Sequence, residues 1–131
     1  MIVAVTETKS HERAKVVGLL VLKALLGVAF LAAGGAKLAG APAMVAVFEK
    51  VGAGQWFRYV TGVLETAGAI GLFLPRFTRS AAALLALVMI GAIAAHLIKL
   101  GGNPTPPIVL LILSALVIWL SAHAPAERNT Q

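Results

Sequence analysis

The chain has 131 residues, of which 60% are hydrophobic and only 12% charged, with a formal net charge of +6. Soluble domains carry roughly 25% charged residues, so this composition excludes a soluble domain and indicates one domain whose main solvent is lipid. The cations are dispersed between apolar runs, which excludes a nucleic-acid-binding face. The absence of cysteine excludes disulfides, dithiol redox catalysis and thiolate metal sites.

Four apolar runs predict four membrane-spanning helices, at Val16–Ala36, Trp56–Leu74, Ser80–Leu100 and Ile108–Ala122. The first three approach the roughly 20 residues that a hydrocarbon core of about 30 Å requires. The fourth is shorter and gains length if Pro107 occupies its first turn, where a missing N–H does no harm. We therefore predict an all-α polytopic membrane protein, with a four-transmembrane-helix bundle over 16–122. A polar cytoplasmic segment over 1–15 precedes this bundle and a polar tail over 123–131 follows it.

The first run follows Lys9, Arg13 and Lys15, as the apolar region of a secretory signal does. A signal's apolar region has only about 7–15 residues, and this run is longer. The comparison favours a retained membrane anchor over a cleaved signal.

Between the first two runs, a segment opened by Pro42 carries apolar residues at helical spacing and charged residues on its other side. This pattern predicts a short helix lying in the membrane interface. An aromatic and cationic anchor, which includes Trp56 and Arg58, follows it at the mouth of the second span. The apolar positions are Met44, Val47, Phe48 and Val51.

An even number of spans places both termini on one side of the membrane. The positive-inside rule then predicts that both termini lie in the cytoplasm, because that side carries more cations. The predicted location is the bacterial cell (inner) membrane. The cations of the cytoplasmic side are Lys9, Arg13, Lys15, Arg76, Arg79 and Arg128, and those of the outer side are Lys37, Lys50, Arg58 and Lys99.

Glu65 lies near the centre of the second run, where a charged side chain costs about 2.5–3.5 kcal/mol. Such a group requires a partner, a proton or a functional role. At a rise of about 1.5 Å per residue, Lys23 and Glu65 lie about 11 and 14 Å from the cytoplasmic ends of their helices, so Lys23 is a candidate ion-pair partner. In the alternative, Lys23 extends its stem to the cytoplasmic interface.

Small residues recur with the ionisable groups on one face of each of the first three spans, which predicts that these faces pack together. The ionisable groups would then converge inside the bundle. The predicted faces are Lys23, Gly27, Phe30, Gly34 and Lys37; Gly62, Glu65, Gly68, Ala69 and Leu72; and Leu85, Met89, Ala92, His96 and Lys99.

Lys37, Tyr59, Glu65 and His96 are the ligand-binding candidates, because an ionisable residue inside a membrane indicates a functional site. Two alternatives stay open: Glu65 fixes helix register through an ion pair, and His96 makes an interhelical hydrogen bond. The histidines lie on separate segments without metal-ligand spacing, and no nucleophile or phosphate-loop motif occurs. No catalytic residue, metal site or intrinsic cofactor is predicted.

Three motifs in chain order resemble those of DoxX-like membrane proteins: Phe30–Leu38, Tyr59–Ala69 with the Leu74-Pro75-Arg76 turn after it, and Met89–His96. The resemblance spans about residues 20–122 and implies a four-helix membrane bundle. It also implies a link to thiosulfate:quinone oxidoreduction and membrane redox complexes, although other relatives resemble chaperones or cargo receptors. Cysteine-bearing relatives differ from this chain, which has none.

Two functions of different class follow. The first is an accessory subunit of a membrane redox complex, whose polar interior binds quinone or a lipid headgroup. Such a subunit would be at most a non-catalytic part of an oxidoreductase, with a partner subunit as its electron source. The alternative is a non-catalytic membrane-protein assembly factor or chaperone. Membrane lipids, a redox partner subunit or further copies of the chain are the expected partners. A small-solute transporter is less favoured, because four helices leave little room for a path.

Overall fold

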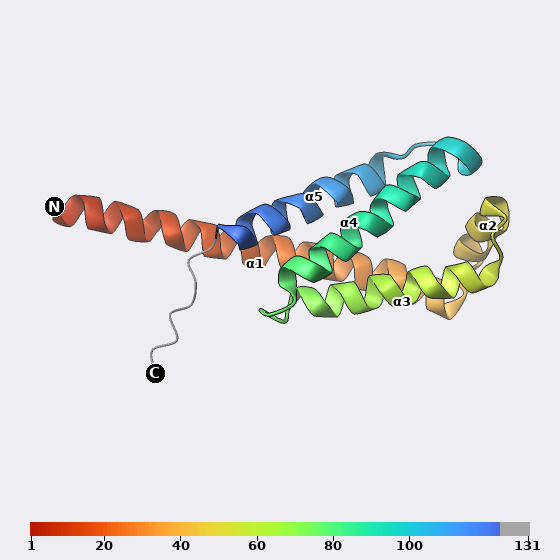
Figure 1. Cartoon of the computed structure of the whole chain (residues 1–131), viewed down its shortest axis with the longest axis horizontal. Helices are drawn as coiled ribbons and strands as arrows, with labels where there is room; N and C mark the ends of the chain where they lie inside the picture. Colours follow the sequence, from red (N-terminus) through yellow and green to blue (C-terminus); the bar gives the residue numbers. More distant parts are fainter. Residues whose placement is uncertain (124–131) are drawn as a thin grey trace.

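Helices connected by short turns make up the whole described chain. A computed structural model describes residues 1–123 and contains no strand within that range (Figure 1). The predicted all-α class is therefore confirmed. The predicted polar tail lies outside the described residues except for His123. The elements are α1 (Ile2–Ala39), α2 (Pro42–Val51), α3 (Gln55–Leu72), α4 (Thr78–Ala95), the π-helix η1 (His96–Leu100) and α5 (Thr105–Ala122).

Three helical segments are long and apolar enough to cross a membrane: Ile2–Ala39, Thr78–Leu100 and Thr105–Ala122. Large apolar side chains are exposed along all three, as expected where lipid is the solvent. The protein is thus a membrane protein. Helix α3 corresponds to the predicted second span but is less apolar, because it carries Arg58 and Glu65. Its crossing of the membrane stays a prediction, and so does the interfacial position of α2.

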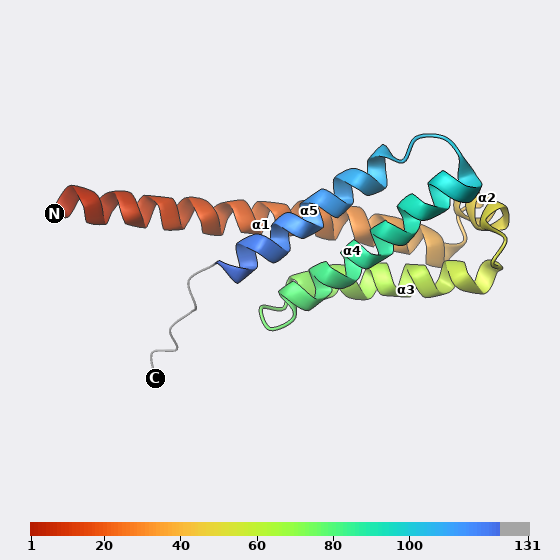
Figure 2. The same cartoon turned by 45° about the horizontal axis from the view of Figure 1, so that its top comes forward.

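Helix α1 begins at Ile2, well before the predicted start at Val16. The predicted polar segment over 1–15 is the first part of this helix, and every residue from 1 to 17 is exposed. Figures 1 and 2 show that this part extends beyond the other helices. The predicted boundary rests on the change from polar to apolar residues at Val16. A change of polarity does not by itself end a helix, whereas glycine and proline disfavour helix. Residues 2–17 contain neither, so the helix continues through them.

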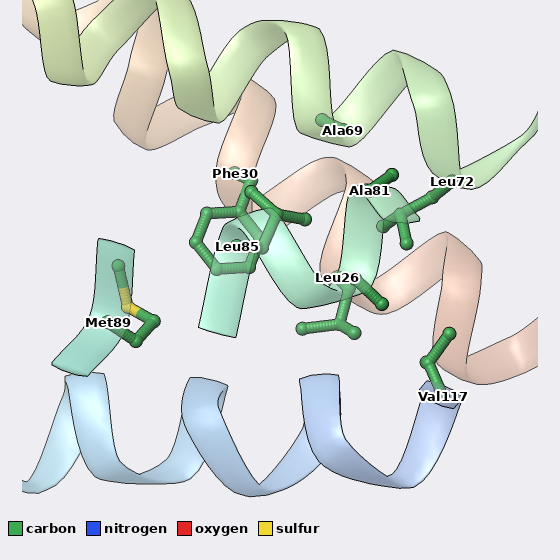
Figure 3. Packing of buried hydrophobic residues seen from close by; sticks show 9 residues of the cluster. Leu26, Phe30, Ala69, Leu72, Ala81, Leu85, Met89 and Val117 are labelled. Carbon is green, nitrogen blue, oxygen red and sulfur yellow. The ribbon is translucent and has the colours of Figure 1, made fainter. Parts of the chain in front are cut away.

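Helices α1, α3, α4 and α5 enclose one apolar core (Figure 3). Phe30 of α1, Leu72 of α3, Leu85 of α4 and Val117 of α5 are all fully buried in it. The predicted faces of α1 and α3 are buried as expected, apart from the two lysines. The prediction is wrong for Lys99, which is exposed because η1 turns the chain at a different rate from the α-helix.

Helices α1 and α3 cross at two glycines, so that their backbones nearly touch. A Cβ atom at Gly34 would lie 2.5 Å from Thr66 Oγ1 and 2.9 Å from the carbonyl oxygen of Gly62. A Cβ atom at Gly62 would lie 3.1 Å from the Cβ of Lys37. Small residues permit this approach between membrane helices, and the crossing places the end of α1 against the middle of α3.

We expect Gly34→Ala to force α1 and α3 apart, because the backbone oxygen of Gly62 cannot move aside as a side chain can. The expected loss of stability is about 1–3 kcal/mol, the usual range for overpacking, measured by thermal unfolding in detergent. Gly35→Ala is the matched control, because a Cβ atom there meets nothing within 4 Å. Equal melting temperatures for the two variants would contradict the close crossing.

Candidate functional site

The close crossing of α1 and α3 joins a lysine to a buried carboxylate. Lys37 Nζ donates a hydrogen bond to Glu65 Oε2 at 2.9 Å. The two side chains are 14% and 2% exposed, and this is the one ion pair within residues 1–123. The last turn of α1 thus supplies the charge partner that a carboxylate in the middle of α3 requires.

The expected partner of Glu65 was Lys23, and the structure corrects this pairing. A Cβ atom at Gly27 would touch the ring of Phe73, so α1 is level with the end of α3 at Gly27. Lys23 lies still further from Glu65, and about 21 Å from Lys37 along α1 at 1.5 Å per residue. The depth of Lys23 was counted from Val16, on the assumption that Val16 is level with the end of α3. The structure instead places the end of α3 beside Gly27, so Lys23 lies beyond it.

Arg58 holds the end of α1 in place, a role that is not among the predictions from the sequence. The guanidinium donates through Nη1 to the carbonyl oxygen of Lys37 and through Nε to Gln55 Oε1 at 2.7 Å. Gln55 Nε2 in turn donates to the carbonyl oxygen of Val45 at 3.1 Å. Arg58, predicted as part of an anchor at the mouth of the second span, is only 4% exposed, and its guanidinium bonds to groups within the protein. The C-terminus of a helix attracts cations. Gly40 marks the C-terminus of α1, and this was the sequence signal for a cation site there.

His96 is the first residue of the π-helix η1, where the sequence predicts a continuous α-helix. Its Nδ1 lies 2.9 Å from the carbonyl oxygen of Ala92. A carbonyl only accepts, so Nδ1 carries the proton and donates. Nε2 of the neutral ring is then an acceptor. The π-turn closes with the N–H of Gly101 donating to the carbonyl oxygen of His96 at 2.9 Å, and such turns are frequent at functional sites.

Lys37, Glu65 and His96 line one cavity of about 480 Å³, which lies between α2, α3 and the α4–η1 segment. Thr61 adds a hydroxyl, which donates to its own helix. The remaining lining side chains are apolar. They include the apolar side of α2, at Met44, Val47, Phe48 and Val51, for which the sequence predicts a position in the membrane interface.

Tyr59 is the one ligand-binding candidate that does not line the cavity. It is 49% exposed, and the Arg58 guanidinium lies 4.3 Å from the centre of its ring. Such cation–π stacking helps to orient Arg58. Among residues 1–123, no group of three or more His, Cys, Asp or Glu side chains lies close enough to hold a metal ion. The cavity therefore offers hydrogen-bonding and charged groups in an apolar surrounding.

The fold and this cavity define a small all-helical membrane protein with a polar interior site. The sequence profile described as the DoxX-like family matches residues 21–119, and the chain belongs to that family. A protein of Bacillus subtilis strain 168 named "Putative oxidoreductase CatD" is 30% identical over 100 residues, which is 75% of each chain. No solved structure matches the chain significantly.

We expect Glu65→Gln and Lys37→Met each to destabilise the protein, because either change leaves the other group buried without its charge partner. Breaking a buried pair from one side costs about 3–5 kcal/mol. The double variant should recover much of this loss in thermal unfolding in detergent. Lys23→Met is the control and should have little effect, since no ion pair involves Lys23 within the described part of the chain. A large effect of that control would contradict the pairing.

Proposed function

We propose that this protein is an accessory subunit of a membrane redox complex, and that its cavity binds quinone or a similar lipid headgroup. The observation that carries the proposal is the composition of the cavity wall, in which Lys37, Glu65 and His96 stand among apolar side chains. Ligand sites in proteins have this composition and volumes of about 300–1,000 Å³, a range that includes this cavity.

The spacing of the polar groups along the bundle suits a quinone. Gly68 contacts Leu85 across the antiparallel α3 and α4, so Glu65 is level with Val88. His96 lies eight residues further along α4, or about 12 Å at 1.5 Å per residue. A quinone ring carries its carbonyl oxygens at opposite ends. Glu65 with its partner Lys37 at one height, and His96 at another, can therefore hydrogen-bond to the two carbonyl oxygens of one quinone ring.

The individual side chains supply complementary chemistry. The ammonium of Lys37 donates to an oxygen acceptor, while the neutral imidazole of His96 accepts at Nε2 or, once protonated, donates there. Glu65 and His96 can also exchange protons with a bound ligand. Quinone supplies two-electron redox chemistry when bound, and a partner subunit would supply the electrons. The name of the Bacillus subtilis relative is consistent with a redox role.

We also propose that α3 crosses the membrane, which gives four spans in a bacterial inner membrane. Helices α1 and α4 run in the same direction in both views, and α3 lies beside them in the opposite direction (Figures 1 and 2). If α1 and α4 cross in the same sense, α3 has to return the chain across the bilayer. Burial of Arg58 and Glu65 against α1 removes their charges from lipid, which supports this proposal. The cavity would then open towards the outer leaflet.

The alternative function is a non-catalytic assembly factor or chaperone. Two observations favour it: Lys37 and Glu65 satisfy each other, and the exposed first part of α1, over residues 1–17, extends beyond the bundle. In that case the ion pair serves packing, and the extension contacts a client protein. Under this alternative the cavity carries no specific ligand, which the next experiment distinguishes.

Protein purified from membranes should carry a quinone in its organic extract, and His96→Leu should carry less. Loss of one hydrogen bond costs about 1 kcal/mol, or roughly fivefold in affinity, measured by mass spectrometry of the extract. His123→Leu is the matched control, because His123 makes the same bond to a carbonyl four residues earlier but is exposed at the end of α5. No quinone or lipid in the wild-type extract would favour the assembly factor.

With four spans and the predicted charge bias, both termini should lie in the cytoplasm. Alkaline phosphatase fused after Gln131 should then be inactive, since it folds only outside the cytoplasm. The same reporter inserted in the loop between η1 and α5, at Gly102, should be active. The reverse pattern would invert the topology and place the cavity in the inner leaflet.

A further inference from the structure

The cavity is open on the flank of α4. Two of the residues that line it, Leu87 and Gly91, are also exposed on the outside of the protein. Leu87 is 66% exposed, and a Cβ atom at Gly91 would meet nothing within 4 Å. The wall between the cavity and the surroundings of α4 is therefore incomplete at these two positions, one helical turn apart.

The surroundings of this opening are hydrocarbon. Helix α4 and η1 together form one of the three segments that are apolar and long enough to cross a membrane. Ile90, next to Gly91, is exposed in the same part of the helix. The opening therefore leads sideways into lipid.

The opening also lies at a specific height relative to the polar groups. Glu65 is level with Val88, and His96 lies further along the same helix, so Gly91 falls between them. A headgroup that bonds to both polar groups would thus have its middle beside Gly91. A substituent on the side of that headgroup would point out through the gap.

We infer that the opening at Leu87 and Gly91 is a lateral portal, through which the hydrocarbon chain of the bound ligand passes into the bilayer. This inference rests on the proposed quinone site and specifies its ligand as a quinone headgroup with a long prenyl-type chain. Gly91 is the specificity-determining residue, because the absence of a side chain there leaves the space that the ligand's hydrocarbon chain occupies. Nothing in the protein packs against Gly91, so packing does not explain a glycine there.

Gly91→Leu tests the portal in full-length protein reconstituted in nanodiscs. The probes are menadione, which is a naphthoquinone headgroup alone, and phylloquinone, which carries the same headgroup on a phytyl chain. Retained quinone is quantified by mass spectrometry across a titration. Gly35→Leu is the matched control, since Gly35 is exposed on α1, meets nothing within 4 Å and does not line the cavity. Each substitution adds the same side chain to an open helix surface, so both variants should fold.

We expect Gly91→Leu to weaken phylloquinone binding at least about tenfold more than it weakens menadione binding, because only phylloquinone has a hydrocarbon chain to pass the new side chain. Gly35→Leu should bind both probes as wild type does. Unchanged phylloquinone binding in Gly91→Leu would overturn the portal while the quinone site stands. An equal loss of both probes would also overturn it, because Gly91 would then contact the headgroup. If wild type binds neither probe, the quinone site itself is wrong and the portal with it.

Discussion

The contact between Gly34 and Gly62 determines much of what is distinctive in this protein. Two helix backbones approach so closely there that a methyl group on Gly34 would overlap the facing helix. The approach brings Lys37 within 2.9 Å of Glu65, which makes it possible to keep a carboxylate inside an apolar bundle. A carboxylate without a partner at that depth would be strongly unfavourable. The packing of small residues and the electrostatics of the interior therefore depend on each other.

The same contact explains why the cavity forms where it does. Helix α1 ends just beyond Lys37, and Gly40, with φ of 73°, turns the chain towards α2. Arg58 bonds to the carbonyl oxygen of Lys37, and Gln55 bonds to both Arg58 and α2. This chain of bonds ties α2 to the first turn of α3 and to the end of α1, and the cavity lies between α2, α3 and the α4–η1 segment. Its polar end groups come from α1, α3 and η1, while most of its wall is apolar.

Much of this arrangement could be predicted from local patterns. The apolar runs predicted the helices, and the spacing of small residues on α3 predicted the buried face from Gly62 to Leu72. The partner of Glu65 could not be predicted, because pairing depends on how far α1 slides along α3. The choice between Lys23 and Lys37 is set by where Gly27 and Gly34 meet α3. The burial of Arg58 could not be predicted either, because Gly40 marks the end of α1 but nothing in the sequence indicates which cation bonds to its last carbonyl groups.

The sequence by itself determined that the chain is an all-helical membrane protein with charged groups inside it, because composition and periodicity depend only on the order of residues. It also determined the family, through motifs that include Lys37, Glu65 and His96. Only the tertiary structure decided that Lys37 pairs with Glu65, that Tyr59 lies outside the cavity, and that the cavity opens beside Gly91. Each of these facts depends on the relative height of helices distant in sequence. That height is set by the shape of their contacting side chains and not by the pattern along any one of them.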